Sequence, residues 1–93
     1  MNMINNIDEH EKRIIYFLDK VKVHFSERDT ALITEFAEHN EWGLAYETLC
    51  TDMCAYNVSI DNQLCEEMIA YGKSIHIDEA YYLPLKELVA SDE

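Results

Sequence analysis

Glycine and proline are nearly absent from this sequence. Two glycines and one proline among 93 residues are too few for a loop-rich or all-β fold, which needs these residues at its many turns. Basic residues are also scarce, since seven Lys and Arg stand against 19 Asp and Glu and leave a formal net charge of −12. A surface of this sign repels phosphate groups, so we expect no direct binding to nucleic acid or to anionic membranes.

Long apolar runs are missing as well. No segment approaches the roughly 20 apolar residues that span a bilayer, and Met1–His10 lacks the basic and apolar regions of a secretory signal. The three cysteines are an odd number, which argues against a disulfide framework and fits a reducing compartment. We therefore expect a cytoplasmic protein.

Signatures of catalysis are missing too. The sequence has no glycine-rich phosphate loop, nucleophile elbow or recognisable pair of catalytic carboxylates, which favours a protein that is not an enzyme and needs no cofactor. Cys50 and Cys54 are four residues apart and would share a helix face, so they could supply two metal ligands. Because no C-x-x-C or H-x-x-x-H spacing accompanies them, we favour buried free cysteines and keep a zinc site as an alternative.

Amphipathic helical patterns fill most of the chain. Apolar residues recur at steps of three and four residues in the segments 7–25, 32–37, 42–56 and 64–75. The first of these stripes consists of Ile7, Ile14, Phe17, Leu18, Val21 and Phe25. A last helical element is expected at 79–89, where Pro84 should end one short turn or begin the next.

Candidate helix caps lie between these segments. Ser26 with Asp29 three residues later is a variant of the capping box, in which Asp replaces the usual Glu or Gln. The other expected N-caps are Asn40 or Glu41, Asp61 and Asp78. With connections of two to five residues, the pattern predicts an all-α fold: one domain over residues 1–93, a small bundle of four to five amphipathic helices with short loops.

The negative charge is unevenly distributed. Residues 1–40 hold eight acids and five bases, whereas residues 41–93 hold eleven acids and two bases. A net −9 in the second half exceeds what solubility requires and suggests a basic partner surface.

Adjacent tyrosines stand within this acidic half. Neighbouring helical residues point about 100° apart, so we expect one ring of the Tyr81-Tyr82 pair to pack inward and the other to stand out among the acids. Tyrosine is enriched at binding hot spots. The residues that we predict to contact a partner are Tyr81, Tyr82, Asp78 and Glu79, followed by Asp52, Tyr56, Glu66 and Glu67 if the third and fourth helices flank the same surface.

The segment from Glu38 to Val89 resembles the MafI-type and CdiI-type immunity proteins of bacterial polymorphic toxin systems. The resemblance is carried by the helix start EWGLAYETLC, the turn with Val58 and Ile60, the pair Gly72-Lys73 and the ending DEAYYLPLKEL. It implies a cytosolic antidote that binds one cognate toxin domain in contact-dependent growth inhibition. The toxins of this class are commonly nucleases, and RNases such as the EndoU-like ones are the leading candidates for the target.

Charge and resemblance favour the same mechanism. A nuclease presents a cationic groove to phosphates, and an acidic protein can be steered to that groove and exclude the substrate. An alternative from another class is a helical adaptor that docks a partner helix in an apolar groove. The sequence leaves open whether the free protein also forms a homodimer.

Overall fold

The part of the chain that the structure describes, residues 5–90 with side chains from residue 9 onward, folds into helices joined by short connections in a computed structural model. The elements are α1 (Asn5–Val21), the 3-10 helix η1 (Lys22–His24), α2 (Glu27–Glu38), α3 (Trp42–Ala55), α4 (Asn62–Ser74), α5 (Glu79–Tyr82) and the 3-10 helix η2 (Leu83–Leu88). The predicted all-α class is confirmed. None of the described helices combines the length and the apolar composition needed to cross a bilayer.

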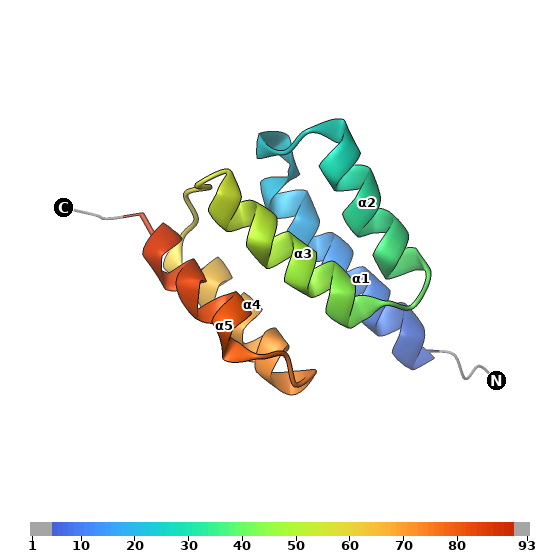
Figure 1. The fold of residues 1–93 in the computed structure, drawn as a ribbon. Helices are drawn as coiled ribbons and strands as arrows, with labels where there is room; N and C mark the ends of the chain where they lie inside the picture. The colour runs from blue at the N-terminus through green and yellow to red at the C-terminus, as the bar shows by residue number, and fades with distance from the viewer. Residues whose placement is uncertain (1–4, 91–93) are drawn as a thin grey trace.

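Helix α3 is the centre of the arrangement (Figure 1). It packs against α1 and α2 on one side and against α5 and η2 on the other, while α4 lies beside α5 and η2. Its apolar content is the highest of the helices because it buries several faces: Ala45, Tyr46, Leu49, Cys50 and Met53 are all fully buried. Each large buried side chain contributes about 1.5–3 kcal/mol relative to exposure.

The predicted apolar stripes of the other helices also form the core. Ile14, Phe17, Leu18 and Val21 of α1 are buried, and Phe25 packs partly against them after η1. The predicted contact of Ile7 lies outside the described side chains. The stripe of α4 is buried at Leu64, Met68 and Tyr71.

Three helices end in the same hydrogen-bonded turn without using glycine. The residue after each C-cap has a left-handed backbone, with φ of 64° at Asn40, 53° at Asn57 and 61° at His76. The next amide then bonds to the carbonyl five residues earlier, from Glu41 to Phe36 (2.9 Å), Val58 to Met53 (3.0 Å) and Ile77 to Gly72 (2.9 Å). This is the Schellman motif, in which glycine is the usual left-handed residue. It explains how a glycine-poor chain makes sharp turns.

The starts of α2, α3, α4 and α5 agree with the sequence, although the N-cap of α3 makes no side-chain hydrogen bond. Ser26, Asp61 and Asp78 accept hydrogen bonds from the backbone of the helices that they precede, as predicted. Glu41 occupies the N-cap of α3, but its side chain makes no cap hydrogen bond. Asn40 does not cap α3, because its left-handed backbone belongs to the end of α2.

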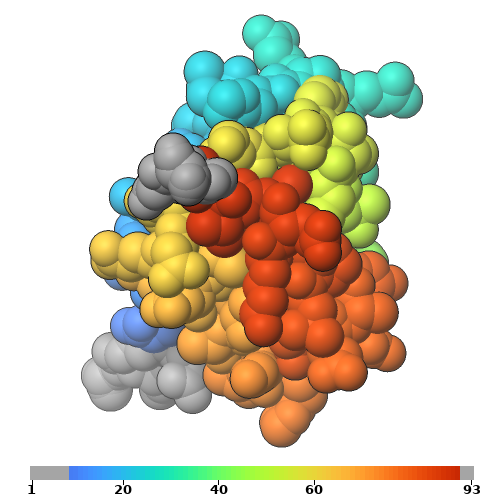
Figure 2. Space-filling model, turned by 90° about the vertical axis from the view of Figure 1, so that its left-hand side faces the viewer, coloured from blue at the N-terminus to red at the C-terminus, as the bar shows by residue number. Residues whose placement is uncertain are grey.

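The last helical element is divided at the proline. Helix α5 ends at Tyr82, and η2 follows with Pro84 in its first turn, so the predicted break is confirmed. Beyond η2, Ile60 and Val89 form an isolated parallel bridge: the Ile60 amide donates to Leu88 O (3.0 Å) and the Ala90 amide donates to Ile60 O (2.9 Å). Figure 2 shows the red residues of η2 lying beside the yellow segment that leads into α4. This bridge ties the start of α4 to the residues that follow η2.

Candidate partner-binding surface

The two adjacent tyrosines of α5 differ in burial. Tyr82 is 6% exposed and belongs to the core, whereas Tyr81 is 38% exposed. This confirms that one ring packs inward and the other outward. A Cβ on Gly72 would lie 2.8 Å from Cδ2 of Tyr82, so the inward ring sits directly on the α4 backbone. In this conformation Tyr81 is the ring of the pair that a partner can reach.

Tyr81 lines a shallow hollow with the outer face of α3. The other residues that line this hollow of about 220 Å³, here named the α3–α5 hollow, are Leu44, Glu47, Thr48 and Thr51. Leu44 is 45% exposed, although leucine side chains are usually buried. Leu44 was not among the predicted contacts. The sequence could have indicated it, because Leu44 is an apolar residue that lies outside the buried stripe of α3.

Three acidic residues bear on this surface: Glu47, which lines the hollow, and Asp78 and Glu79, which precede Tyr81 in the sequence. Glu47 is half-buried and makes no hydrogen bond or ion pair with the described side chains, whose one salt bridge joins Lys22 to Asp19 at 2.9 Å. Glu79 is exposed in the first turn of α5 and is likewise unpaired among residues 9–90. Asp78 Oδ1 accepts a bond from the Ala80 amide (2.9 Å), which fixes this carboxylate at the helix start. The Tyr81 amide in turn donates to Asp78 O (3.0 Å), which ties the two residues together at the start of α5.

Tyr56 lies elsewhere, at the corner where α3 ends near the start of α2. Its hydroxyl accepts a bond from the Ser26 amide (3.3 Å) and donates to Asp29 Oδ2 (2.6 Å). The Ser26 hydroxyl accepts from the Asp29 amide (3.1 Å), which is one half of a capping box. The Asp29 carboxylate bonds to the Tyr56 hydroxyl and not directly to the Ser26 amide. The Tyr56 hydroxyl bridges the Ser26 amide and the Asp29 carboxylate, and so replaces the second hydrogen bond of a capping box.

Asp52 belongs to the same corner. Burial, and then the negative charge of Asp29, raise the pKa of the Asp52 carboxyl above its ordinary value. Asp52 and Tyr56 thus share surroundings with α2, and neither lines the α3–α5 hollow.

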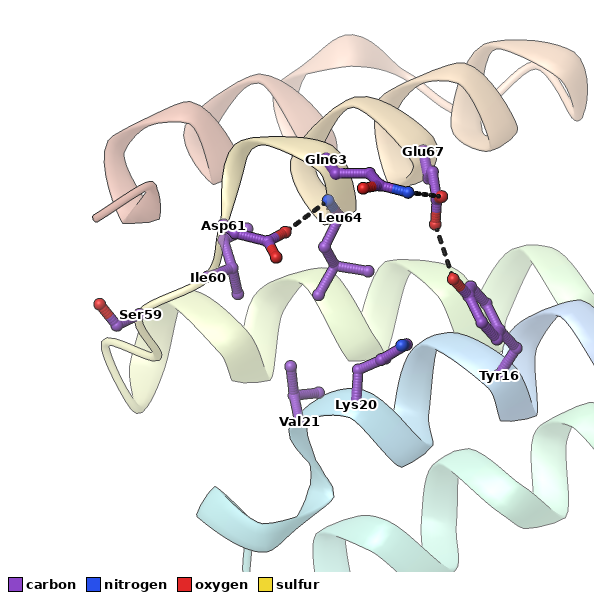
Figure 3. Close-up of a pocket in the computed structure, with 9 residues that line it drawn as sticks. All are labelled: Tyr16, Lys20, Val21, Ser59, Ile60, Asp61, Gln63, Leu64 and Glu67. Carbon is purple, nitrogen blue, oxygen red and sulfur yellow. Dashed lines mark hydrogen bonds between the residues drawn. The ribbon is translucent and has the colours of Figure 1, made fainter. Parts of the chain in front are cut away.

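Glu67 lies in a third place, the pocket between α1 and the start of α4 (Figure 3). In this pocket of about 300 Å³, Glu67 accepts bonds from the Tyr16 hydroxyl (2.9 Å) and from Gln63 Nε2 (3.2 Å). These two hydrogen bonds, that of Gln63 first, lower the pKa of the Glu67 carboxyl. Glu66 on the same helix accepts from Asn62 Nδ2 (3.0 Å). Both carboxylates have partners within the chain.

The eight predicted contact residues are therefore divided. Asp78, Glu79 and Tyr81 are exposed at the N-cap and in the single turn of α5, and of these Tyr81 lines the α3–α5 hollow. The others lie in the core (Tyr82), at the corner of α2 and α3 (Asp52, Tyr56) and on α4 (Glu66, Glu67). Glu79 and Tyr81 differ from Tyr56, Glu66 and Glu67 in that their side chains make no hydrogen bond among residues 9–90.

The three cysteines are free thiols. Cys50 and Cys65 are buried and Cys54 is half-buried, and burial raises the pKa of the Cys50 thiol to about 12. Within residues 9–90 no three metal-ligating side chains come together. Cys50 thus behaves as a small apolar core residue, as the favoured interpretation predicted.

Fold and surface together define an all-α helical protein in which Glu47, at the α3–α5 hollow, forms no ion pair with the described side chains. Comparison with known protein families, with curated proteins and with solved structures finds no significant match. The resemblance to immunity proteins stays a prediction that rests on the residues quoted above.

Proposed function

We propose that this protein is a cytoplasmic immunity protein that binds and neutralises a bacterial toxin domain, with an RNase as the leading target, and that it acts by binding alone. The observation that carries the proposal is the combination of Tyr81, Leu44 and Glu47 on one surface. Exposed apolar and aromatic groups beside an unpaired carboxylate are typical of a protein contact that selects a basic partner. The resemblance of residues 38–89 supplies the kind of partner.

The charge supports a mechanism in two stages. At long range, the net charge of −12 attracts a cationic nuclease surface and raises the association rate, to about 10⁸ M⁻¹s⁻¹ or more at low salt. At short range, Tyr81 and Leu44 exclude water at the centre of the contact, which slows dissociation. An inhibitor that covers the phosphate-binding groove in this way blocks the substrate without any chemical step.

Coexpression with the product of the reading frame directly upstream tests the proposal. We expect the two proteins to purify as a complex and the chain to restore growth of cells that make the toxin domain. Failure to recover a complex, together with no growth rescue, would contradict the immunity function.

Salt dependence of the association rate separates the proposal from the adaptor alternative. Steering to a basic surface predicts a rate that falls steeply with ionic strength, because the Debye length shortens from roughly 10 Å at 0.1 M salt to 3 Å at 1 M. An adaptor that docks an apolar helix predicts a rate almost independent of salt.

Alanine at Tyr81 tests the surface. We expect Tyr81→Ala to weaken the complex by about 2 kcal/mol. Tyr16→Ala is a matched control, because Tyr16 is also 38% exposed but lies on α1. If both variants and the unchanged protein bound the toxin equally well, the prediction that the α3–α5 side contacts the toxin would be wrong.

A further inference from the structure

The α3–α5 hollow has the dimensions of a subsite for one side chain. Its volume of about 220 Å³ is below the roughly 300–1,000 Å³ of pockets that enclose small-molecule ligands. The residues that line it are one tyrosine, one leucine, two threonines and one glutamate. An occupant that fits this lining has an apolar stem and a polar end.

The polar groups of the hollow favour a cation. The Glu47 carboxylate accepts hydrogen bonds and donates none, and the face of the Tyr81 ring carries partial negative charge. Glu47 is half-buried and has no ion-pair partner among the described residues, so a positive group that enters the hollow can pair with its carboxylate.

Tyr16 is an exposed tyrosine of the same chain that has cations beside its ring. The Arg13 guanidinium lies 5.6 Å from the centre of the Tyr16 ring, and Lys20 Nζ lies 5.1 Å from it. Tyr81 is equally exposed at 38%, yet no Lys or Arg of the described segment lies over its ring. Within residues 9–90, cations therefore lie over the ring of Tyr16 but not over that of Tyr81.

Arginine suits this lining better than lysine. A guanidinium is planar, stacks on aromatic rings and can bind a carboxylate through two parallel hydrogen bonds, and it loses less hydration than an ammonium group. Its aliphatic stem can cover Leu44, which is 45% exposed.

We propose that the α3–α5 hollow is a binding subsite for one arginine side chain of a partner protein. The guanidinium pairs with Glu47 and stacks on Tyr81, and the stem packs against Leu44. The inference rests on the proposed function for the identity of the partner, since it names the group that the same surface recognises.

Titration of the isotope-labelled full chain with N-acetyl-arginine amide, followed by NMR, tests this subsite directly. We expect saturable shifts of the amide signals of Leu44, Thr48 and Tyr81. The neutral isostere N-acetyl-citrulline amide should give no saturable shifts, and N-acetyl-lysine amide should bind more weakly. Equal shifts with the citrulline or the lysine compound, or shifts confined to other elements, would overturn the proposal.

Two variants test whether arginine binding depends on the Glu47 carboxylate and on the Tyr81 ring. Glu47→Gln should weaken arginine binding at least fivefold, and Tyr81→Leu should weaken it while keeping an apolar side chain at this position. Glu66→Gln removes a carboxylate from α4 and should leave binding unchanged. Unchanged binding by Glu47→Gln, with the helical circular dichroism intact, would overturn the proposal.

The outcomes separate the subsite from the immunity function. The arginine titration needs no toxin, so saturable binding without any toxin complex would uphold the subsite and contradict the function. A toxin complex that Glu47→Gln leaves at full affinity would uphold the function and contradict the subsite.

Discussion

A methyl group on Gly72 would lie 2.6 Å from the hydroxyl oxygen of Tyr46. That hydroxyl donates a hydrogen bond of 2.6 Å to the carbonyl of Met68, one turn earlier in α4. Tyr82 of α5 approaches the same position, with its Cδ2 2.8 Å from the added methyl group. Helices α3, α4 and α5 therefore meet at a position where the missing side chain allows two tyrosines to approach the backbone.

Gly72→Ala should destabilise the protein. The added methyl group forces Tyr46 and Tyr82 to move, and such overpacking costs about 1–3 kcal/mol, although alanine is the better helix former by about 1 kcal/mol. Urea unfolding measures the difference. Gly43→Ala is the control, because its Cβ would be 3.7 Å from Ile77 Cδ1, an ordinary contact, and it should not destabilise. Equal stability of the two variants would contradict the close packing at Gly72.

His76→Gly should stabilise the end of α4. His76 has φ of 61°, a conformation that costs a residue with a Cβ about 1 kcal/mol or more and glycine almost nothing. After the larger unfolded-state entropy of glycine is subtracted, we expect a gain of about 0.5 kcal/mol in the free energy of unfolding. Ala70→Gly, in the same helix, should lose about 1 kcal/mol. If both variants lost stability, the left-handed backbone conformation of His76 at the end of α4 would be contradicted.

Tyr56→Phe should weaken the corner between α2 and α3. The variant removes the hydroxyl that bridges the Ser26 amide and the Asp29 carboxylate, and we expect a loss of about 0.5–1.5 kcal/mol in thermal or urea unfolding. Tyr81→Phe removes a hydroxyl for which residues 9–90 provide no hydrogen-bond partner. It should therefore leave stability unchanged, and an equal loss in both variants would exclude a specific role for the bridge.

Asp52→Asn should raise stability at neutral pH and not in acid. The folded state raises the pKa of Asp52 above its ordinary 3.8, so it binds the proton more tightly than the unfolded chain does. The stability contributed by Asp52 is therefore present when the group is protonated and falls as the pH rises through the interval between the two pKa values. Solvent screening limits the gain at pH 7 to a few tenths of a kcal/mol.

Glu87→Gln is the control for Asp52→Asn, since removing any negative charge from this acidic chain reduces general repulsion. Glu87 is exposed on η2. Melting curves at pH 7 and pH 3 compare the two. A gain for Asp52→Asn that is the same at both pH values, or no larger than that of Glu87→Gln, would contradict the local effect of burial and Asp29.

The helices and most of their caps were predictable because they depend on neighbours in sequence. Periodicity places Phe17 and Met68 on buried stripes, and a polar residue before a stripe, such as Asp61, caps the next helix. The sequence left Asn40 and Glu41 open as the N-cap of α3, because asparagine favours both an N-cap and a left-handed helix end. Only the hydrogen bonds around it distinguish the two roles.

The candidate surface was less predictable because it depends on residues far apart in the chain. Tyr56 was predicted as a contact residue, and nothing in the sequence indicated that its hydroxyl also bonds to Asp29, 27 residues away. Glu67 was predicted in the same way, and its partner Tyr16 is 51 residues away. The hollow itself requires α5 to lie across α3, which no local pattern specifies.

The bridge at Ile60 closes residues 60–90 into a loop whose two ends are hydrogen-bonded to each other. Its two hydrogen bonds join residue 60 to residues 88–90, so the backbone between them, with α4, α5 and Tyr81, forms one loop held at its neck. A partner that holds Tyr81 against α3 also disfavours breaking the two hydrogen bonds at Ile60. The amide protons of Ile60 and Ala90 then exchange with solvent more slowly in the complex than in the free protein, although neither residue belongs to the hollow.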